Sequence, residues 1–127
     1  MNYLLDTHAF LWYVDGNPML PLGIRRVIKN SETAKFVSIA SLWEIAIKTG
    51  KEKLALTRPF ETLPEYIEVN NFILLPIQPK HLFDLKELPH HHGDPFDRLI
   101  IAQAITENLT IISADRQFKD YPVEVIW

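Results

Sequence analysis

Short runs of aliphatic and β-branched residues alternate along the chain with longer segments whose apolar residues recur at helical spacing. The short runs predict strands at residues 3–5, 36–39, 72–76, 109–113 and 123–126. The segments between them, at residues 8–14, 22–30, 39–50, 59–71, 79–88 and 95–108, are long enough for helical crossovers. Such alternation is typical of a mainly parallel sheet. The pattern therefore predicts an α/β fold with a central, mainly parallel five-stranded sheet flanked by helices.

No feature of the sequence divides this pattern into parts. The 127 residues contain no internal repeat, low-complexity stretch or linker, and 47% of them are hydrophobic, which is enough for a substantial core. We therefore expect a single domain over residues 1–127. The N-terminus lacks a basic start followed by a long apolar run, and no segment approaches the roughly 18 apolar residues of a membrane span. These features predict a soluble, cytoplasmic protein with no membrane partner.

Composition and charge restrict the possible chemistry. The chain has no cysteine, so a bound metal ion would need oxygen or imidazole ligands. Thirteen basic and sixteen acidic residues give a net charge of −3, which does not by itself indicate a polyanionic partner. If four of the sixteen acids surround a cation, twelve remain against the thirteen bases. A nucleic-acid partner is then still possible.

Four acidic residues are expected at one edge of the sheet. Asp6 follows the first strand and Asp115 the fourth, whereas Asp97 opens the helix that leads into the fourth strand. Glu44 lies in the first turns of the helix after the second strand. Ligands of open α/β sheets bind beyond the carboxyl ends of the strands. Clustered carboxylates repel one another unless a cation is present, and their hard oxygens suit Mg²⁺ or Mn²⁺, which can assist phosphodiester hydrolysis.

Taken singly, each acid also has a purely structural interpretation. Asp6 and Asp115 can cap the helices that follow them. Glu44 fits a capping box with Ser41 and an i,i+4 ion pair with Lys48.

A second pair of acids surrounds a Pro-Phe dipeptide in the segment DPFD. Asp94 suits the N-cap of the next helix, because Pro95 is tolerated in a first turn. Asp97 heads the apolar stripe of that helix and therefore points inward. It needs a partner there, which can be the positive helix terminus, a cation or both.

Four segments in this order resemble the PIN domain and, within it, the VapC-type toxins of bacterial and archaeal toxin–antitoxin pairs: YLLDTHAFLW, VSIASLWEIAIKTGKEKL, DPFDRLIIAQA and IISADRQFKDY. The resemblance covers essentially the whole chain and implies a PIN-like fold. It also implies a magnesium- or manganese-dependent ribonuclease with catalytic, metal-binding acids at Asp6, Glu44, Asp97 and Asp115. The hydroxyl residues Thr7 and Ser113 would orient carboxylates or metal-bound water.

The resemblance further implies an RNA substrate and an antitoxin encoded beside the protein, and we expect a homodimer. Residues 10–14 are apolar on too many sides for one buried stripe, so they line a partner groove or dimer face, or else pack in the core. Arg98 is expected beside the site, holding a scissile phosphate or pairing with an acid. RNA contacts are expected first from three lysines and then from other basic residues: Lys48, Lys51 and Lys53, then Arg25, Arg26, Lys29 and Arg58.

The segment HHHGDPFD raises two further expectations. His90 to His92 are predicted to form a solvated loop near the RNA entrance, away from the metal, because consecutive histidines in a turn do not share one face. Gly93 stands where relatives of this branch often carry a basic residue, so a phosphate contact can be missing there.

Three other classes of protein gather acids in a similar way. A phosphatase of the haloacid dehalogenase type needs a second acid two residues after the first, where this chain has His8. A receiver domain needs a phosphoacceptor after the third strand, and FILLPIQPK has no acid. A non-catalytic PIN-like binding module remains the alternative, and it should be indifferent to Mg²⁺ or Mn²⁺, whereas the enzyme should be stabilised by them.

Overall fold

The computed structural model describes all 127 residues, and five of its segments form one sheet. Neighbouring strands all pair in parallel, in the order β3-β2-β1-β4-β5. The prediction of a mainly parallel five-stranded sheet is therefore confirmed, and the sheet is parallel throughout. The strands are β1 (Tyr3–Leu5), β2 (Lys35–Ser38), β3 (Phe72–Leu75), β4 (Thr110–Ile112) and β5 (Val125–Ile126).

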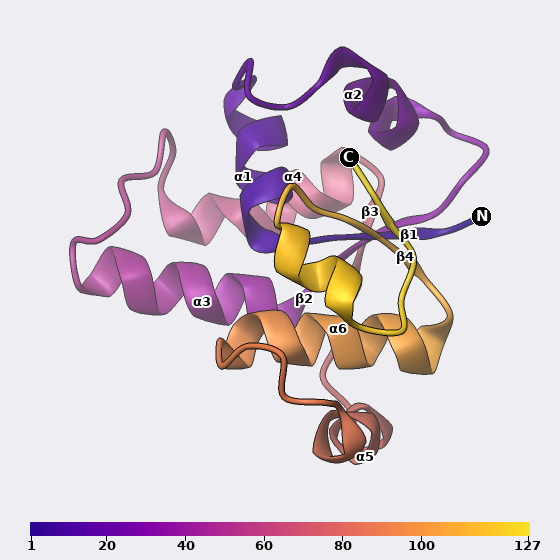
Figure 1. Ribbon diagram of the computed structural model, residues 1–127. Coiled ribbons are helices and arrows are strands. Elements are labelled where there is room, and N and C mark those ends of the chain that lie inside the picture. The colour runs from indigo at the N-terminus through magenta and orange to yellow at the C-terminus, as the bar shows by residue number, and fades with distance from the viewer.

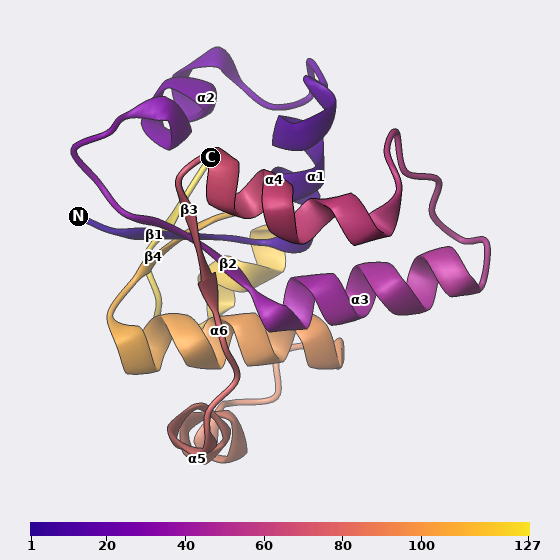
Figure 2. The same cartoon turned by 180° about the vertical axis from the view of Figure 1, so that it is seen from behind.

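Helices cover both faces of this sheet, with α1, α2 and α4 on one side and α6 on the other, beyond which α5 lies (Figures 1 and 2). None of them is both long and apolar enough to cross a membrane. The α-helices are α1 (Thr7–Asp15), α2 (Leu22–Lys29), α3 (Ile39–Gly50), α4 (Leu63–Val69), α5 (Pro79–Glu87) and α6 (Pro95–Glu107), and the 3₁₀ helices are η1 (Phe60–Thr62) and η2 (Arg116–Asp120).

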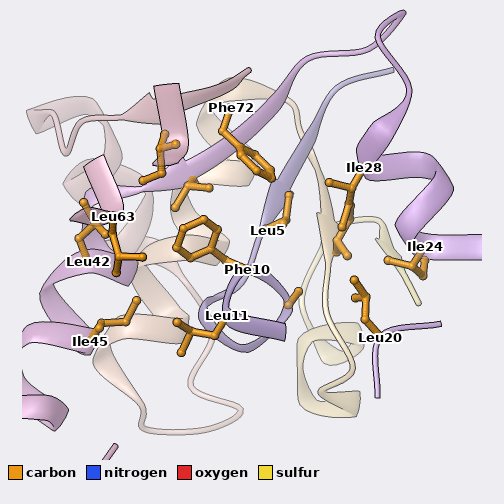
Figure 3. Close-up of a cluster of buried hydrophobic side chains, with 14 residues drawn as sticks. Leu5, Phe10, Leu11, Leu20, Ile24, Ile28, Leu42, Ile45, Leu63 and Phe72 are labelled. Atoms are coloured by element: carbon orange, nitrogen blue, oxygen red, sulfur yellow. The ribbon is translucent and has the colours of Figure 1, made fainter. Parts of the chain in front are cut away.

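The alternation of side chains along each strand divides the interior into two hydrophobic cores. Leu5 of β1 faces the core under α1, α2 and α4, and Figure 3 shows it near the buried ring of Phe10. Leu4 faces the opposite core, which contains Ile100 and Ile101 of α6. Burial on both faces explains why the central strands β1 and β4 are mostly hydrophobic.

Most elements end within one or two residues of the predicted bounds, and two larger details differ from the sequence-based expectations. Strand β2 ends at Ser38 because the Ser38 hydroxyl accepts a hydrogen bond from the Ala40 N–H and caps α3. The capping box expected at Ser41 is therefore wrong, since that residue already lies inside the helix. The segment predicted as one helix over 59–71 is divided into η1 and α4.

Residues 10–14, predicted to line a partner groove or dimer face or to pack in the core, lie in helix α1. Phe10 and Leu11 are buried in the first core, so the core alternative is confirmed for these two residues. Trp12, Tyr13 and Val14 are half-buried along its margin.

The order of the strands creates a binding position at the carboxyl ends of β1 and β4. The chain leaves β1 towards β2 and β3 and then returns to the other side of β1 for β4 and β5. This reversal leaves β1 and β4 adjacent, and the Asp6 N–H donates to the Ile112 carbonyl oxygen at 3.0 Å. Ligands of open α/β sheets bind in the crevice at such a reversal.

Candidate active site

Asp6 lies at this reversal and is held by hydrogen bonds to both of its oxygens. Its Oδ1 accepts from the Ala9 N–H at 2.8 Å and so caps α1, and its Oδ2 accepts from the Ser113 hydroxyl at 2.5 Å. Burial raises the pKa of Asp6 and the Asp115 charge adds to this effect, whereas the two hydrogen bonds oppose it. The cap predicted from the sequence is confirmed, and the same carboxylate is part of the crevice.

Glu44 is buried and joins α3 to the start of α1 through Thr7. The Thr7 hydroxyl donates to its Oε1 at 2.6 Å and lies 3.0 Å from the Ser41 Oγ. The Lys48 Nζ lies 2.5 Å from its Oε2, which confirms the predicted ion pair. This hydrogen bond to Glu44 raises the pKa of Lys48. Thr7 therefore fixes a carboxylate, as the resemblance implies.

Asp97 has a strongly perturbed carboxyl group. Its side chain is 20% exposed, and no protein group donates a hydrogen bond to it. Burial raises its pKa from 3.8 to about 8, and the charges of Asp94, Glu44, Asp6 and Asp115 contribute in that order. Glu44, Asp6 and Asp115 are thus within electrostatic reach of Asp97. We call Asp6, Glu44, Asp97 and Asp115 the carboxylate cluster.

Asp94 and Asp115 are N-caps, as predicted. Asp94 Oδ1 accepts from the N–H groups of Phe96 and Asp97 at 2.9 and 3.0 Å and begins α6. Asp115 Oδ1 accepts from the Gln117 N–H at 2.9 Å and begins η2. Ser113 connects this turn to Asp6, because its hydroxyl also accepts from the Asp115 N–H at 3.0 Å.

The donor set of the carboxylate cluster suits a hard divalent cation, although its acids do not form a ready-made ligand shell. No three His, Asp or Glu side chains stand close enough together to hold a metal ion. All four donors are carboxylates, however, and an added positive charge would offset the repulsion that adds to the effect of burial on the pKa of Asp97. The residues therefore fit Mg²⁺ or Mn²⁺ by chemistry and charge.

The prediction for Arg98 is wrong. Its side chain is buried, so the guanidinium is not exposed for a phosphate contact, and it forms no ion pair with an acid. The guanidinium instead donates to the carbonyl oxygens of Pro89 at 2.7 Å and Leu88 at 3.2 Å, and to the Tyr121 hydroxyl at 3.2 Å. Arg98 thus anchors the loop that precedes α6.

Five of the seven other predicted basic RNA contacts fall into three groups, and the remaining two, Arg26 and Lys29, are exposed on α2. The Lys48 ammonium is paired with Glu44, and its RNA contact remains a prediction. Lys51 and Lys53 are exposed at the end of α3, and their RNA contacts remain predictions. Arg25 and Arg58 stack over the rings of Tyr13 and Tyr66, with the guanidinium carbons 5.3 and 4.9 Å from the ring centres.

The histidine loop is solvated only in part. His90 and His91 are exposed as expected, whereas the His92 side chain is only 7% exposed. Its Nε2 lies 3.5 Å from Asp97 Oδ2, and its Nδ1 lies 2.7 Å from the Tyr121 hydroxyl. The expectation that all three histidines lie away from the acids is therefore wrong for His92. The contact with the Tyr121 hydroxyl holds the His92 ring in the interior, next to Asp97.

An aromatic pair beside the carboxylate cluster was not predicted. Trp43, the neighbour of Glu44, is 51% exposed and meets Phe96, the neighbour of Asp97, with ring centres 4.9 Å apart at 86°. The amino-acid sequence does not indicate this contact, because Trp43 and Phe96 lie on different helices, α3 and α6, and meet only in the tertiary structure. Tyr121 was missed for the same reason.

Comparisons with known proteins agree with this architecture. The profile of the PIN domain family matches residues 3–124. No match is found among curated proteins.

Several solved structures share the fold at low sequence identity. VapBC2 from Rickettsia felis, bound to a DNA fragment from its promoter, is 21% identical with a TM-score of 0.75, over 100% of this chain and 99% of that one. FitAcB from Neisseria gonorrhoeae is 19% identical with a TM-score of 0.70, over 98% and 96% of the two chains. DNA-bound VapBC from Salmonella typhimurium is 16% identical with a TM-score of 0.72, over 99% and 97%.

Proposed function

This chain belongs to the PIN domain family, and we propose that it is a Mg²⁺- or Mn²⁺-dependent endoribonuclease that acts as the toxin of a toxin–antitoxin pair. One observation carries the proposal. Carboxylates from distant parts of the chain act on Asp97 where the strand order reverses: burial raises the pKa of Asp97 to about 8, and the charges of Asp94, Glu44, Asp6 and Asp115 add to this effect. Such a concentration of negative charge opposes folding unless a ligand balances it.

The carboxylate cluster would hold the divalent cation. When bound, the cation supplies Lewis-acid chemistry for phosphodiester hydrolysis. Asp97 is the carboxylate with no donor from the protein, so its oxygens are available to a ligand. Ser113 and Thr7 hold Asp6 and Glu44 in place, which reduces the reorganisation needed on binding.

Features around the cluster support an RNA substrate with unpaired bases. The half-exposed Trp43 ring, supported edge-on by Phe96, offers a face on which a base can stack. Lys51 and Lys53, exposed at the end of the same helix α3, can contact phosphates. Single-stranded or looped RNA presents bases that are free to stack in this way.

The proposed partner is a small antitoxin. VapBC2 from Rickettsia felis and VapBC from Salmonella typhimurium share this fold and are described as VapBC assemblies, which supports an analogous partner here. A basic side chain from such a partner could occupy the carboxylate cluster in place of the cation. Its apolar residues could contact Trp12 and Val14, which are half-buried along α1. A homodimer is also proposed.

A cleavage assay on defined RNA tests the enzyme. Purified protein is incubated with labelled single-stranded and hairpin RNA in Mg²⁺, Mn²⁺ or EDTA. We expect cleavage only with the cation, its loss in Asp97→Asn, and its retention in Asp120→Asn, which removes the same charge from an exposed residue of η2. Equal cleavage in EDTA, or by Asp97→Asn, would overturn the proposal. Co-expression of the neighbouring reading frame tests the partner, which should co-purify and suppress cleavage.

A further inference from the structure

His92 occupies an unusual position next to the carboxylate cluster. Its imidazole is more than nine-tenths buried, against the rings of Phe118 and Tyr121 at centre distances of 6.3 and 5.4 Å. Its Nε2 is the only buried side-chain nitrogen or oxygen without a hydrogen-bond partner. That atom faces Asp97 Oδ2 at 3.5 Å, slightly beyond hydrogen-bond distance.

The surroundings of Tyr121 determine which nitrogen of His92 carries the proton. The Tyr121 hydroxyl oxygen lies 3.2 Å from the Arg98 Nη1 and 3.1 and 3.3 Å from the backbone nitrogens of His92 and His91. All three groups can only donate, so the oxygen acts towards them as an acceptor. Its single proton is then directed to the His92 Nδ1 at 2.7 Å. A neutral imidazole that accepts at Nδ1 carries its proton on Nε2.

The buried Nε2–H is therefore a donor aimed at a carboxylate that has no other donor. A buried N–H without an acceptor is unfavourable, and a small movement of Asp97 would provide one. The hydrogen bond would engage Oδ2 and leave Oδ1 for another ligand. Hydrogen bonds of this kind orient the carboxylates that bind metals.

We infer that His92 is a positioning residue whose Nε2–H, oriented by Tyr121 and Arg98, donates to Asp97 and aligns this carboxylate for the divalent cation. The inference rests on the proposed function, because it concerns how the same site binds its cation. It also explains why Arg98 is buried: the guanidinium supports the hydroxyl that orients His92.

The tautomer can be tested without any metal. Long-range ¹H–¹⁵N NMR of the imidazole nitrogens distinguishes a protonated from an unprotonated nitrogen. At a pH where His92 is neutral we expect the Nε2 signal of a protonated nitrogen and the Nδ1 signal of an unprotonated one. Tyr121→Phe should shift this population towards the other tautomer. A proton on Nδ1 in the unchanged protein would overturn the inference.

The positioning role is tested by cation affinity of the full chain, from titrations of Mn²⁺ followed by the paramagnetic resonance of the free ion. His92→Phe keeps an aromatic ring and removes the donor, and it should weaken Mn²⁺ binding about 10- to 100-fold. His92→Gln keeps an N–H donor and should recover much of the loss. His90→Phe changes an exposed neighbour and should bind Mn²⁺ like the unchanged protein. Thermal unfolding in EDTA checks that each variant is folded.

The outcomes separate this inference from the proposed function. If the unchanged protein binds Mn²⁺ and Asp97→Asn does not, but His92→Phe binds as tightly as the unchanged protein, the inference alone is wrong. A loss that His92→Gln does not reduce also overturns it. If the unchanged protein binds no Mn²⁺, the proposed function fails and the inference fails with it. If His92→Phe does not fold, the Mn²⁺ affinities of His92→Gln and Tyr121→Phe decide. If Tyr121→Phe binds Mn²⁺ as tightly as the unchanged protein, Tyr121 does not orient His92 for this role and the inference is wrong.

Discussion

Replacing Asp97 with asparagine should stabilise the cation-free protein at pH 8 and have little effect at pH 4. The substitution keeps the size and shape of the side chain and removes its charge. In the folded protein the pKa of Asp97 is raised to about 8, first by burial and then by the neighbouring carboxylates. Asparagine is neutral at every pH, so it avoids both the cost of burying a charge and the repulsion from the neighbouring carboxylates.

The sign and size of the effect follow from proton linkage. In the unfolded chain the carboxyl ionises near its ordinary pKa of 3.8, whereas in the folded protein it ionises near 8. Between these values the folded state binds more protons, so stability falls as the pH rises and levels off above about 8. Each pKa unit corresponds to about 1.4 kcal/mol, which sets an upper limit of about 6 kcal/mol. Because the side chain is 20% exposed and can turn towards water, we expect a measured gain of about 1–3 kcal/mol at pH 8.

Urea unfolding in EDTA at pH values from 4 to 9 measures this gain directly. The control is Asp120→Asn, which removes one negative charge from an exposed position and should show no comparable dependence on pH. Added Mg²⁺ should stabilise the unchanged protein and not Asp97→Asn, because only the former keeps the complete carboxylate cluster. A gain independent of pH, or a loss of stability at pH 8, would refute the reasoning.

Three further predictions concern the residues around the cluster. Asp94→Asn should cost less than about 0.5 kcal/mol in urea unfolding, whereas Asp94→Ala should cost about 1 kcal/mol, because asparagine also caps a helix; equal losses would contradict this assignment. Arg98→Met should lower the free energy of unfolding by about 2–4 kcal/mol through loss of its hydrogen bonds to Leu88 and Pro89, and an unchanged stability would show that the buried guanidinium contributes little. Trp43→Ala should weaken RNA binding by about 1–3 kcal/mol in a titration without cleavage, in EDTA, and Trp43→Phe should weaken it less; equal affinities of all three proteins would exclude stacking on this ring.

Much of the fold could be predicted because its determinants are local. Strand β1 was predicted at its observed bounds, Tyr3–Leu5, from a short apolar run. Asp94 was identified as an N-cap because a cap and the N–H groups that it accepts are at most three residues apart. The meeting of the acids could also be anticipated, since the carboxyl ends of parallel strands share one edge of the sheet.

Directions of side chains within the site depended on the tertiary structure instead. Glu44 fits a local capping box in the sequence, yet the helix begins earlier, at Ser38, and Glu44 points inward to Thr7, 37 residues away. Nothing within one helical turn specifies that contact. Only the packing of α1 against α3 does so.

The directions of the Arg98 and His92 side chains, at the loop before α6, also depended on the tertiary structure. Next to an expected acidic site, the sequence favours an arginine that faces the acids. In the structure its acceptors lie 9, 10 and 23 residues away, on Pro89, Leu88 and Tyr121. Tyr121 comes from the far end of the chain, and it holds both Arg98 and the His92 ring. The sequence by itself determined the caps at Asp6, Asp94 and Asp115 and which strand ends carry acids, because those signals span about one turn. The tertiary structure decided which polar groups face one another, because their partners are brought together only when the two layers of helices pack on the sheet.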